Sequence, residues 1–230
     1  MTIDNFFNQF IKGYLISDLK NMYDLKPNNG EYGATGYPML ITILAGMELI
    51  GALTYNSSGV FDPHKGHDHF SNFWNVYFVT MFPEYKGLDS LFRQLVRNGI
   101  SHIFLAKKGV MVTKGSGKRP IVDKSQRLIL IDANKLFDDF EKVINKKILP
   151  LLTVKSGEPS KASMQTMLKK IEQEYDNSEL EKLYKSLSIS SAVINGPMVS
   201  GASLSTVSLT GNFATVSPSL QAIFDKHNNN

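Results

Sequence analysis

The sequence predicts a mainly α-helical protein: a helical bundle with one inserted β-hairpin and a Ser/Thr-rich C-terminal extension. Three observations favour this fold class. Apolar residues recur at helical spacing over most of residues 3–148. Two short strand-like runs flank a basic, glycine-containing turn within residues 109–131. The composition then changes, since 13 of the 34 residues from 186 to 219 are Ser or Thr.

Each expected helix has its own signal. Phe7 and Ile11 belong to the apolar face of the first helix, and Pro38 suits the first turn of the second, where an N–H would lack a partner. The second helix is apolar nearly all round, so we expect it at the centre. Asp132 is expected to be the N-cap of a further helix, because its carboxylate can accept a hydrogen bond from a first-turn N–H, and Pro150 marks the end of that helix. The expected helices span residues 3–23, 38–55, 70–82, 87–98, 132–148 and 160–187.

The expected hairpin pairs the strand 110–113 with the strand 127–131. We predict a domain at 1–153 that includes this hairpin, followed by a C-terminal part at 154–230 with one helix and the Ser/Thr-rich extension. The role of residues 186–230 stays open among a small set of strands, a flexible tail and a segment that orders on a partner.

Composition favours a protein of the cytoplasm. The chain has 230 residues and no cysteine, so it offers neither disulfides nor a thiolate metal site. Its start lacks the pattern of a signal peptide. The most hydrophobic stretch, 37–55, contains Glu48 and is marginal in length for a membrane span, so we interpret it as a buried core helix. We therefore expect no membrane association.

Positive charge concentrates in the middle of the chain. Residues 86–155 contain 15 Lys and Arg against 6 Asp and Glu, a difference of +9 in a chain of net charge +4. Such a region can bind phosphate groups, although a solvated lysine surface explains the charge equally well.

The segment Arg97-Asn98-Gly99-Ile100-Ser101-His102 contains residue types suited to RNA cleavage. An arginine at the end of a rigid helix can donate a planar fork of hydrogen bonds to a phosphate. A histidine just beyond the helix can exchange a proton near neutral pH. RNA supplies its own nucleophile, the 2′-hydroxyl, so the chemistry needs a base, positive charge and a proton donor, but no metal or other cofactor.

This segment resembles the R-x(4–6)-H motif of the HEPN superfamily, in which a polar residue, often Asn, directly follows the arginine. The resemblance covers residues 3–150 and implies a HEPN-like helical bundle. It further implies a metal-independent endoribonuclease in which two protomers form a composite cleft. Arg97 would stabilise the phosphate, His102 would serve as base or acid, and Asn98 would orient the site. Such proteins act as toxins of toxin–antitoxin pairs, antiviral defence effectors or RNA-processing factors, so an antitoxin or nucleotidyltransferase partner is expected beside a homodimer.

A second reading remains open. On an uninterrupted helix His102 would lie about 140° from Arg97, so the two converge only if Gly99 ends the helix or a second protomer completes the site. The alternative is a partly buried histidine and a surface arginine in a catalytically inactive HEPN-like interaction module that binds a protein or a nucleotide.

Basic residues around the motif are candidates for contacts with the RNA backbone. Arg93 falls on the side of its helix away from the apolar stripe. The other cations follow the motif closely in sequence, although a solvated hairpin tip explains them as well. The candidate RNA-binding residues are Arg93, Lys107, Lys108, Lys114, Lys118 and Arg119.

Three further patterns are weaker. His64, His67 and His69 are dense enough to hold a metal but match no standard zinc motif, so we expect a polar loop and leave metal binding open. Lys114-Gly115-Ser116-Gly117-Lys118 lacks the first glycine and the final Ser/Thr of a phosphate-binding loop, so we interpret it as a hairpin turn. The aromatic residues of 73–82 are expected in the core rather than stacked on bases.

Overall fold

The first helix of the chain is continuous from Ile3 to Asp24, as its apolar spacing predicts. Thr2 caps it, because the Thr2 side chain accepts a hydrogen bond from the Asn5 N–H at 3.2 Å. The middle of the helix is π-helical, so its side chains follow a wider period than 3.6 residues, and Tyr14 is exposed rather than part of the buried face. Its segments are α1 (Ile3–Phe6), η1 (Phe7–Ile16) and α2 (Ser17–Asp24).

The computed structural model describes residues 1–26, 35–55, 61–97 and 108–174, all within one compact unit, Met1–Asp176.

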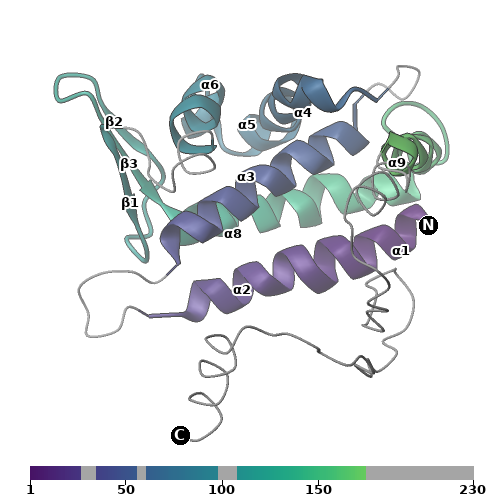
Figure 1. The fold of residues 1–230 in the computed structure, drawn as a ribbon, viewed down its shortest axis with the longest axis horizontal. Helices are drawn as coiled ribbons and strands as arrows, with labels where there is room; N and C mark the ends of the chain where they lie inside the picture. Colours follow the sequence, from purple (N-terminus) through teal and green to yellow (C-terminus); the bar gives the residue numbers. More distant parts are fainter. Residues whose placement is uncertain (27–34, 56–60, 98–107, 175–230) are drawn as a thin grey trace, which may run out of the picture. The chain divides into compact units, whose positions relative to one another are not determined.

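Helix α3 (Gly36–Leu53) lies at the centre of this unit, as its all-round apolar sequence predicts. Its neighbours are α2, α4 (Gly66–Asn72), η4 (Phe73–Phe78), η6 (Phe92–Arg97), strand β1 (Val110–Thr113), α8 (Ala133–Val143) and α9 (Lys161–Glu174). Its first residue, Gly36, lies near β1, and its last turn lies near α9 (Figure 1). Gly51 permits close packing, because a Cβ there would stand 1.9 Å from the carbonyl oxygen of His69 on α4.

Among the described residues, α3 is also the helix that is long and apolar enough to cross a membrane. Of its 18 residues, 56% are buried inside the unit. A central core helix has this combination of length, composition and burial.

An aromatic helix packs against α3 and continues the core. Trp74 is fully buried, its indole N–H donates to the carbonyl oxygen of Tyr85 at 3.2 Å, and its ring lies 4.9 Å from that of Phe92. The expectation that these aromatic residues form core is confirmed, since Phe73, Trp74, Tyr77, Phe78 and Phe82 are all buried. The segments are η3 (Pro63–Lys65), α4 (Gly66–Asn72), η4 (Phe73–Phe78), α5 (Val79–Met81) and η5 (Pro83–Tyr85).

The predicted hairpin at 109–131 is corrected by the structure. β1 (Val110–Thr113) and β3 (Leu128–Asp132) pair in parallel, and β2 (Ile121–Asp123) pairs antiparallel to β3, giving the strand order β1-β3-β2. The segment between β1 and β2 therefore reverses the chain direction but passes the end of β3, so that β1 and β2 pair with opposite edges of β3. The Asp132 carboxylate holds this crossover, because it accepts hydrogen bonds from Ser116 Oγ at 2.5 Å and from the Gly117 N–H at 2.8 Å.

Asp132 also begins the next helix, and its predicted role as N-cap is confirmed by a hydrogen bond from the Lys135 N–H at 3.1 Å. Helix α9 packs against α1 and α3, and the side chain of Gln165 accepts a hydrogen bond from the Ile3 N–H at 2.6 Å. The segments are α8 (Ala133–Val143), η7 (Ile144–Ile148), η8 (Leu149–Thr153) and α9 (Lys161–Glu174). The Ser/Thr-rich segment lies outside the described residues.

Candidate functional site

The motif helix consists of α6 (Asp89–Leu91) and η6 (Phe92–Arg97). Phe92 and Val96 are fully buried and fix it against the core, as its apolar stripe predicts. Arg97 is the last described residue of η6. The side chain of Arg97 and the candidates Asn98, His102 and Lys107 lie outside the part of the chain that is described.

Arg93, one helical turn before Arg97, is half-buried. Its Nε is buried and has no hydrogen-bond partner among the described residues. Buried N–H donors in folded proteins are nearly always paired. The Arg93 Nε–H is therefore an unused donor, as far as the described residues go, one helical turn before Arg97.

The Lys114 side chain binds backbone groups of this same chain instead of extending into solvent. Its ammonium donates to the carbonyl oxygens of Met22 at 2.6 Å and Leu25 at 2.7 Å, at the C-terminal end of α2. Burial lowers the pKa of Lys114 below the usual range, against the attraction of Asp24 and Asp132. A cation at a helix C-terminus satisfies carbonyl groups that lack partners within the helix.

Arg119 belongs to a second internal arrangement, centred on Asp139. The Asp139 carboxylate, only 2% exposed, accepts hydrogen bonds from Arg119 Nε at 2.8 Å and from the Tyr85 hydroxyl at 3.1 Å. Lys135 Nζ lies 3.0 Å from the same carboxylate, and Arg119 also pairs with Glu84 at 2.6 Å. Burial and the adjacent carboxylate of Asp139 raise the pKa of Tyr85, so its hydroxyl remains a donor.

The remaining candidates on the sheet, Lys108 and Lys118, are exposed. Lys108 precedes Gly109, whose carbonyl oxygen accepts a hydrogen bond from the Ile129 N–H at 2.7 Å. A Cβ at Gly109 would stand 2.3 Å from the carbonyl oxygen of Arg127, so the two backbones touch. Lys108 and Arg127 therefore lie at the same end of the sheet, the end that follows the motif segment.

Sequence reasoning missed two cations at this end, Lys124 and Arg127, both exposed. They lie in the turn between β2 and β3, which is fixed because the Asp123 carboxylate accepts hydrogen bonds from the Ser125 N–H at 2.9 Å and the Gln126 N–H at 3.0 Å. An Asp followed by Lys-Ser-Gln is the signal that could have located this turn. We call Lys108, Lys124 and Arg127 the basic end of the sheet.

The expectation of a polar loop around the three histidines is corrected, because His64 lies on η3 and His67 and His69 lie on α4. Their side chains do not converge. His64 and His67 are exposed, whereas His69 is 5% exposed and points inward. The described residues contain no group of three or more His, Cys, Asp or Glu side chains placed to hold a metal ion. Burial lowers the pKa of His69 below its ordinary 6.5, with Asp68 and Asp62 acting in the opposite direction.

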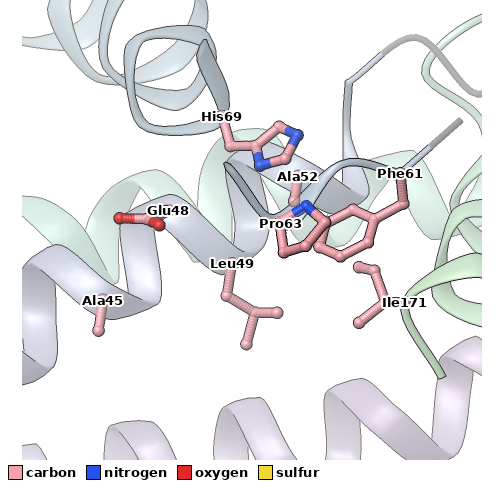
Figure 2. Close-up of a pocket in the computed structure, with 8 residues that line it drawn as sticks. All are labelled: Ala45, Glu48, Leu49, Ala52, Phe61, Pro63, His69 and Ile171. Atoms are coloured by element: carbon pink, nitrogen blue, oxygen red, sulfur yellow. The ribbon is translucent and has the colours of Figure 1, made fainter. Parts of the chain in front are cut away.

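His69 lines a pocket of about 180 Å³ between α3, α4 and α9 (Figure 2). The ring of His69 is stacked on Phe61, with centroids 5.4 Å apart and planes 9° apart, and Tyr55 meets its edge at 5.6 Å. A second pocket, of about 400 Å³, shares Phe61, Pro63 and His69 with it. The residues that line the smaller pocket are Ala45, Glu48, Leu49, Ala52, Phe61, Pro63, His69 and Ile171.

Comparison of the whole chain with protein families, with curated proteins and with solved structures finds no match.

Proposed function

We propose that this chain is a metal-independent endoribonuclease of the HEPN type, working as a cytoplasmic homodimer in a toxin–antitoxin or antiviral defence role. The observation that carries the proposal is the segment Arg97-Asn98-Gly99-Ile100-Ser101-His102, whose first residue belongs to the anchored helical segment η6. Buried Phe92 and Val96 hold that helix in place, as a site for transition-state stabilisation requires.

In the proposed reaction, His102 takes the proton of a ribose 2′-hydroxyl. The resulting oxygen attacks the adjacent phosphorus, and the bond to the 5′-oxygen of the next nucleotide breaks. That oxygen takes up a proton, so the products are a 2′,3′-cyclic phosphate and a 5′-hydroxyl. Arg97 would neutralise the charge that develops on the phosphate, and Asn98 would orient the two groups.

Two features of the described surface support a polyanionic substrate. Arg93, one turn from Arg97, has a buried Nε without a partner among the described residues. The basic end of the sheet is the end at which the chain enters β1 after the motif segment, and it carries three exposed cations. Phosphate contacts of this kind supply most of the affinity for a nucleic acid.

The decisive experiment is cleavage of a mixed-sequence RNA in excess EDTA, with product ends identified by mass spectrometry. The variants are His102→Ala and, as a matched control, the exposed His67→Ala. Cyclic-phosphate ends from the parent and from His67→Ala, with loss of at least about 100-fold in His102→Ala, would support the proposal. Equal cleavage by all three proteins would reject it.

An inactive HEPN-like interaction module is the second candidate function. It is favoured by the positions of Lys114 and Arg119, because both cations bind groups of this same chain. If the parent protein leaves RNA intact at concentrations that enforce dimers, binding should be measured calorimetrically. The partner to test is the protein encoded next to this chain, an antitoxin or a nucleotidyltransferase by expectation.

A further inference from the structure

The His69 imidazole is held rigidly but lacks a polar partner. His69 is only 5% exposed, and the rings of Phe61 and Tyr55 fix the orientation of its imidazole. Among the described residues, no hydrogen bond holds either ring nitrogen, and the buried side-chain atoms that lack a partner do not include them, so both nitrogens are accessible from solvent at the pocket (Figure 2). A neutral imidazole nitrogen that is accessible at an apolar pocket can exchange a hydrogen bond with a ligand.

The rest of the pocket wall defines what can enter. Leu49, Ala52, Phe61, Pro63 and Ile171 are apolar, so the pocket favours an apolar body. A volume of about 180 Å³ is near that of engineered cavities of roughly 150 Å³ that accept benzene. Nucleotides and drug-sized molecules need pockets of roughly 300 Å³ or more.

Charge further narrows the ligand class. His69 is neutral at pH 7, since burial lowers its pKa, so the pocket offers no cation to an anionic ligand. The Glu48 carboxylate lies at the pocket rim against the first residue of α4, because a Cβ at Gly66 would stand 2.3 Å from Glu48 Oε1. An anion would meet this carboxylate and lose its hydration without compensation.

We propose that the pocket between α3, α4 and α9 binds a small neutral ring compound that carries one O–H or N–H group, which hydrogen-bonds to the imidazole of His69. Ala45, exposed at the rim, leaves the pocket open to solvent. The ring of the ligand packs between Leu49, Phe61 and Ile171. This site is separate from the motif helix and is independent of the proposed nuclease activity.

The test uses two probes, 4-fluorophenol and fluorobenzene, titrated by ¹⁹F NMR into the full chain. The first probe has the hydroxyl and the second lacks it. The variant His69→Phe keeps an aromatic ring between Phe61 and Tyr55 but removes both nitrogens, and His67→Phe makes the same change at an exposed position of the same helix. The variant Ile171→Trp fills the pocket from α9.

We expect saturable binding of 4-fluorophenol with a Kd below about 1 mM. Fluorobenzene should bind about tenfold more weakly, and His69→Phe should remove that difference while His67→Phe keeps it. Ile171→Trp should abolish binding of both probes.

Equal binding of the two probes to the parent protein would overturn the proposal, and so would absence of saturation up to about 5 mM. Unchanged discrimination in His69→Phe would overturn it as well. Thermal melting confirms that each variant is folded. If His69→Phe does not fold, the comparison of probes on the parent protein and on Ile171→Trp still decides the question.

Discussion

At the scale of single residues, Asp139 connects three parts of the chain. Its carboxylate, on α8, bonds to Tyr85 before the motif helix, to Arg119 between β1 and β2, and to Lys135 one turn away. Arg119 also stacks over the ring of Phe82, 4.6 Å from its centroid. This buried carboxylate therefore fixes the sheet connection and the start of the motif helix on α8.

Replacing Asp139 by Asn should lower the free energy of unfolding by about 3 kcal/mol, because Arg119 and Lys135 lose their buried counter-charge. Urea denaturation followed by circular dichroism measures the change. The neighbouring exposed Asp138→Asn is the control and should alter stability by less than about 0.5 kcal/mol. Equal losses in both variants would show that the Asp139 interactions contribute nothing specific.

Burial of His69 should make the free energy of unfolding depend on pH in the range below 6.5, the ordinary pKa of a histidine. Above that pH, His69 is neutral in both the folded and the unfolded chain. Below it, the unfolded chain binds a proton that the folded chain excludes, so stability falls as pH falls. Relative to His69→Phe, the free energy of unfolding of the wild type should fall by up to about 1.4 kcal/mol for each pH unit by which the pH is lowered.

Urea titrations at three pH values, about 7.5, 6.5 and 5.5, measure this difference. Asp132 contributes acid sensitivity of the same sign, because its hydrogen bonds from Ser116, Lys135 and Gly117 hold its pKa low despite burial. That contribution is common to both proteins and cancels. A constant difference between wild type and His69→Phe across the range would contradict the prediction.

At the scale of elements, the sheet sorts its cations into two groups. Lys114 and Arg119 bind partners on α2, α8 and the turn at Glu84. Lys108, Lys124 and Arg127 stand exposed at the end that follows the motif. Lys118, directly before Arg119 in sequence, is exposed as well. Contacts with remote elements, rather than local sequence, therefore decide which of these cations are paired.

Replacing Lys108, Lys124 and Arg127 together by Ala should weaken RNA binding at least about tenfold near physiological salt and reduce the slope of log affinity against log salt by about 2. Fluorescence anisotropy in a His102→Ala background measures binding to intact RNA. The control replaces exposed lysines of α8, η7 and α9 with the same loss of charge, at Lys142, Lys146 and Lys169. A similar loss in the control would assign the effect to net charge alone.

At the scale of the whole molecule, the proposed nuclease requires two copies of the chain. The resemblance to HEPN proteins implies a cleft in which two motifs face each other. In a two-fold symmetric dimer each protomer presents the same patch to the other. Activity should therefore fall on dilution below the dimer dissociation constant, as followed by analytical ultracentrifugation and RNA cleavage at matched concentrations.

Mixing Arg97→Ala with His102→Ala should restore activity that neither variant has. After exchange of subunits, half of the dimers are mixed and each retains one of two Arg–His pairs across the interface, so about a quarter of the parent activity is expected. The parent protein mixed with itself is the control for the exchange procedure. A mixture as inactive as its components would place the whole motif within one protomer.

Much of the fold could be predicted from sequence because it depends on local signals. Helical spacing located the first helix and α3, and the chemistry of Asp132 located the start of α8. The burial of Trp74 and its aromatic neighbours followed from their spacing in the same way. The candidate motif was likewise found as a short, contiguous segment.

Only the tertiary structure decided which distant groups meet. Lys114 reaches carbonyl groups about 90 residues away at the C-terminal end of α2. Strand β3 lies between β1 and β2 and pairs in parallel with β1, and Asp132 at the end of β3 binds the segment that connects β1 to β2. His69 was one of three similar histidines in sequence, yet packing against Phe61 turned it inward. Spacing along a chain predicts periodic faces and caps, whereas contacts between remote elements depend on how those faces pack, and that packing decided the roles of Lys114, Arg119 and His69.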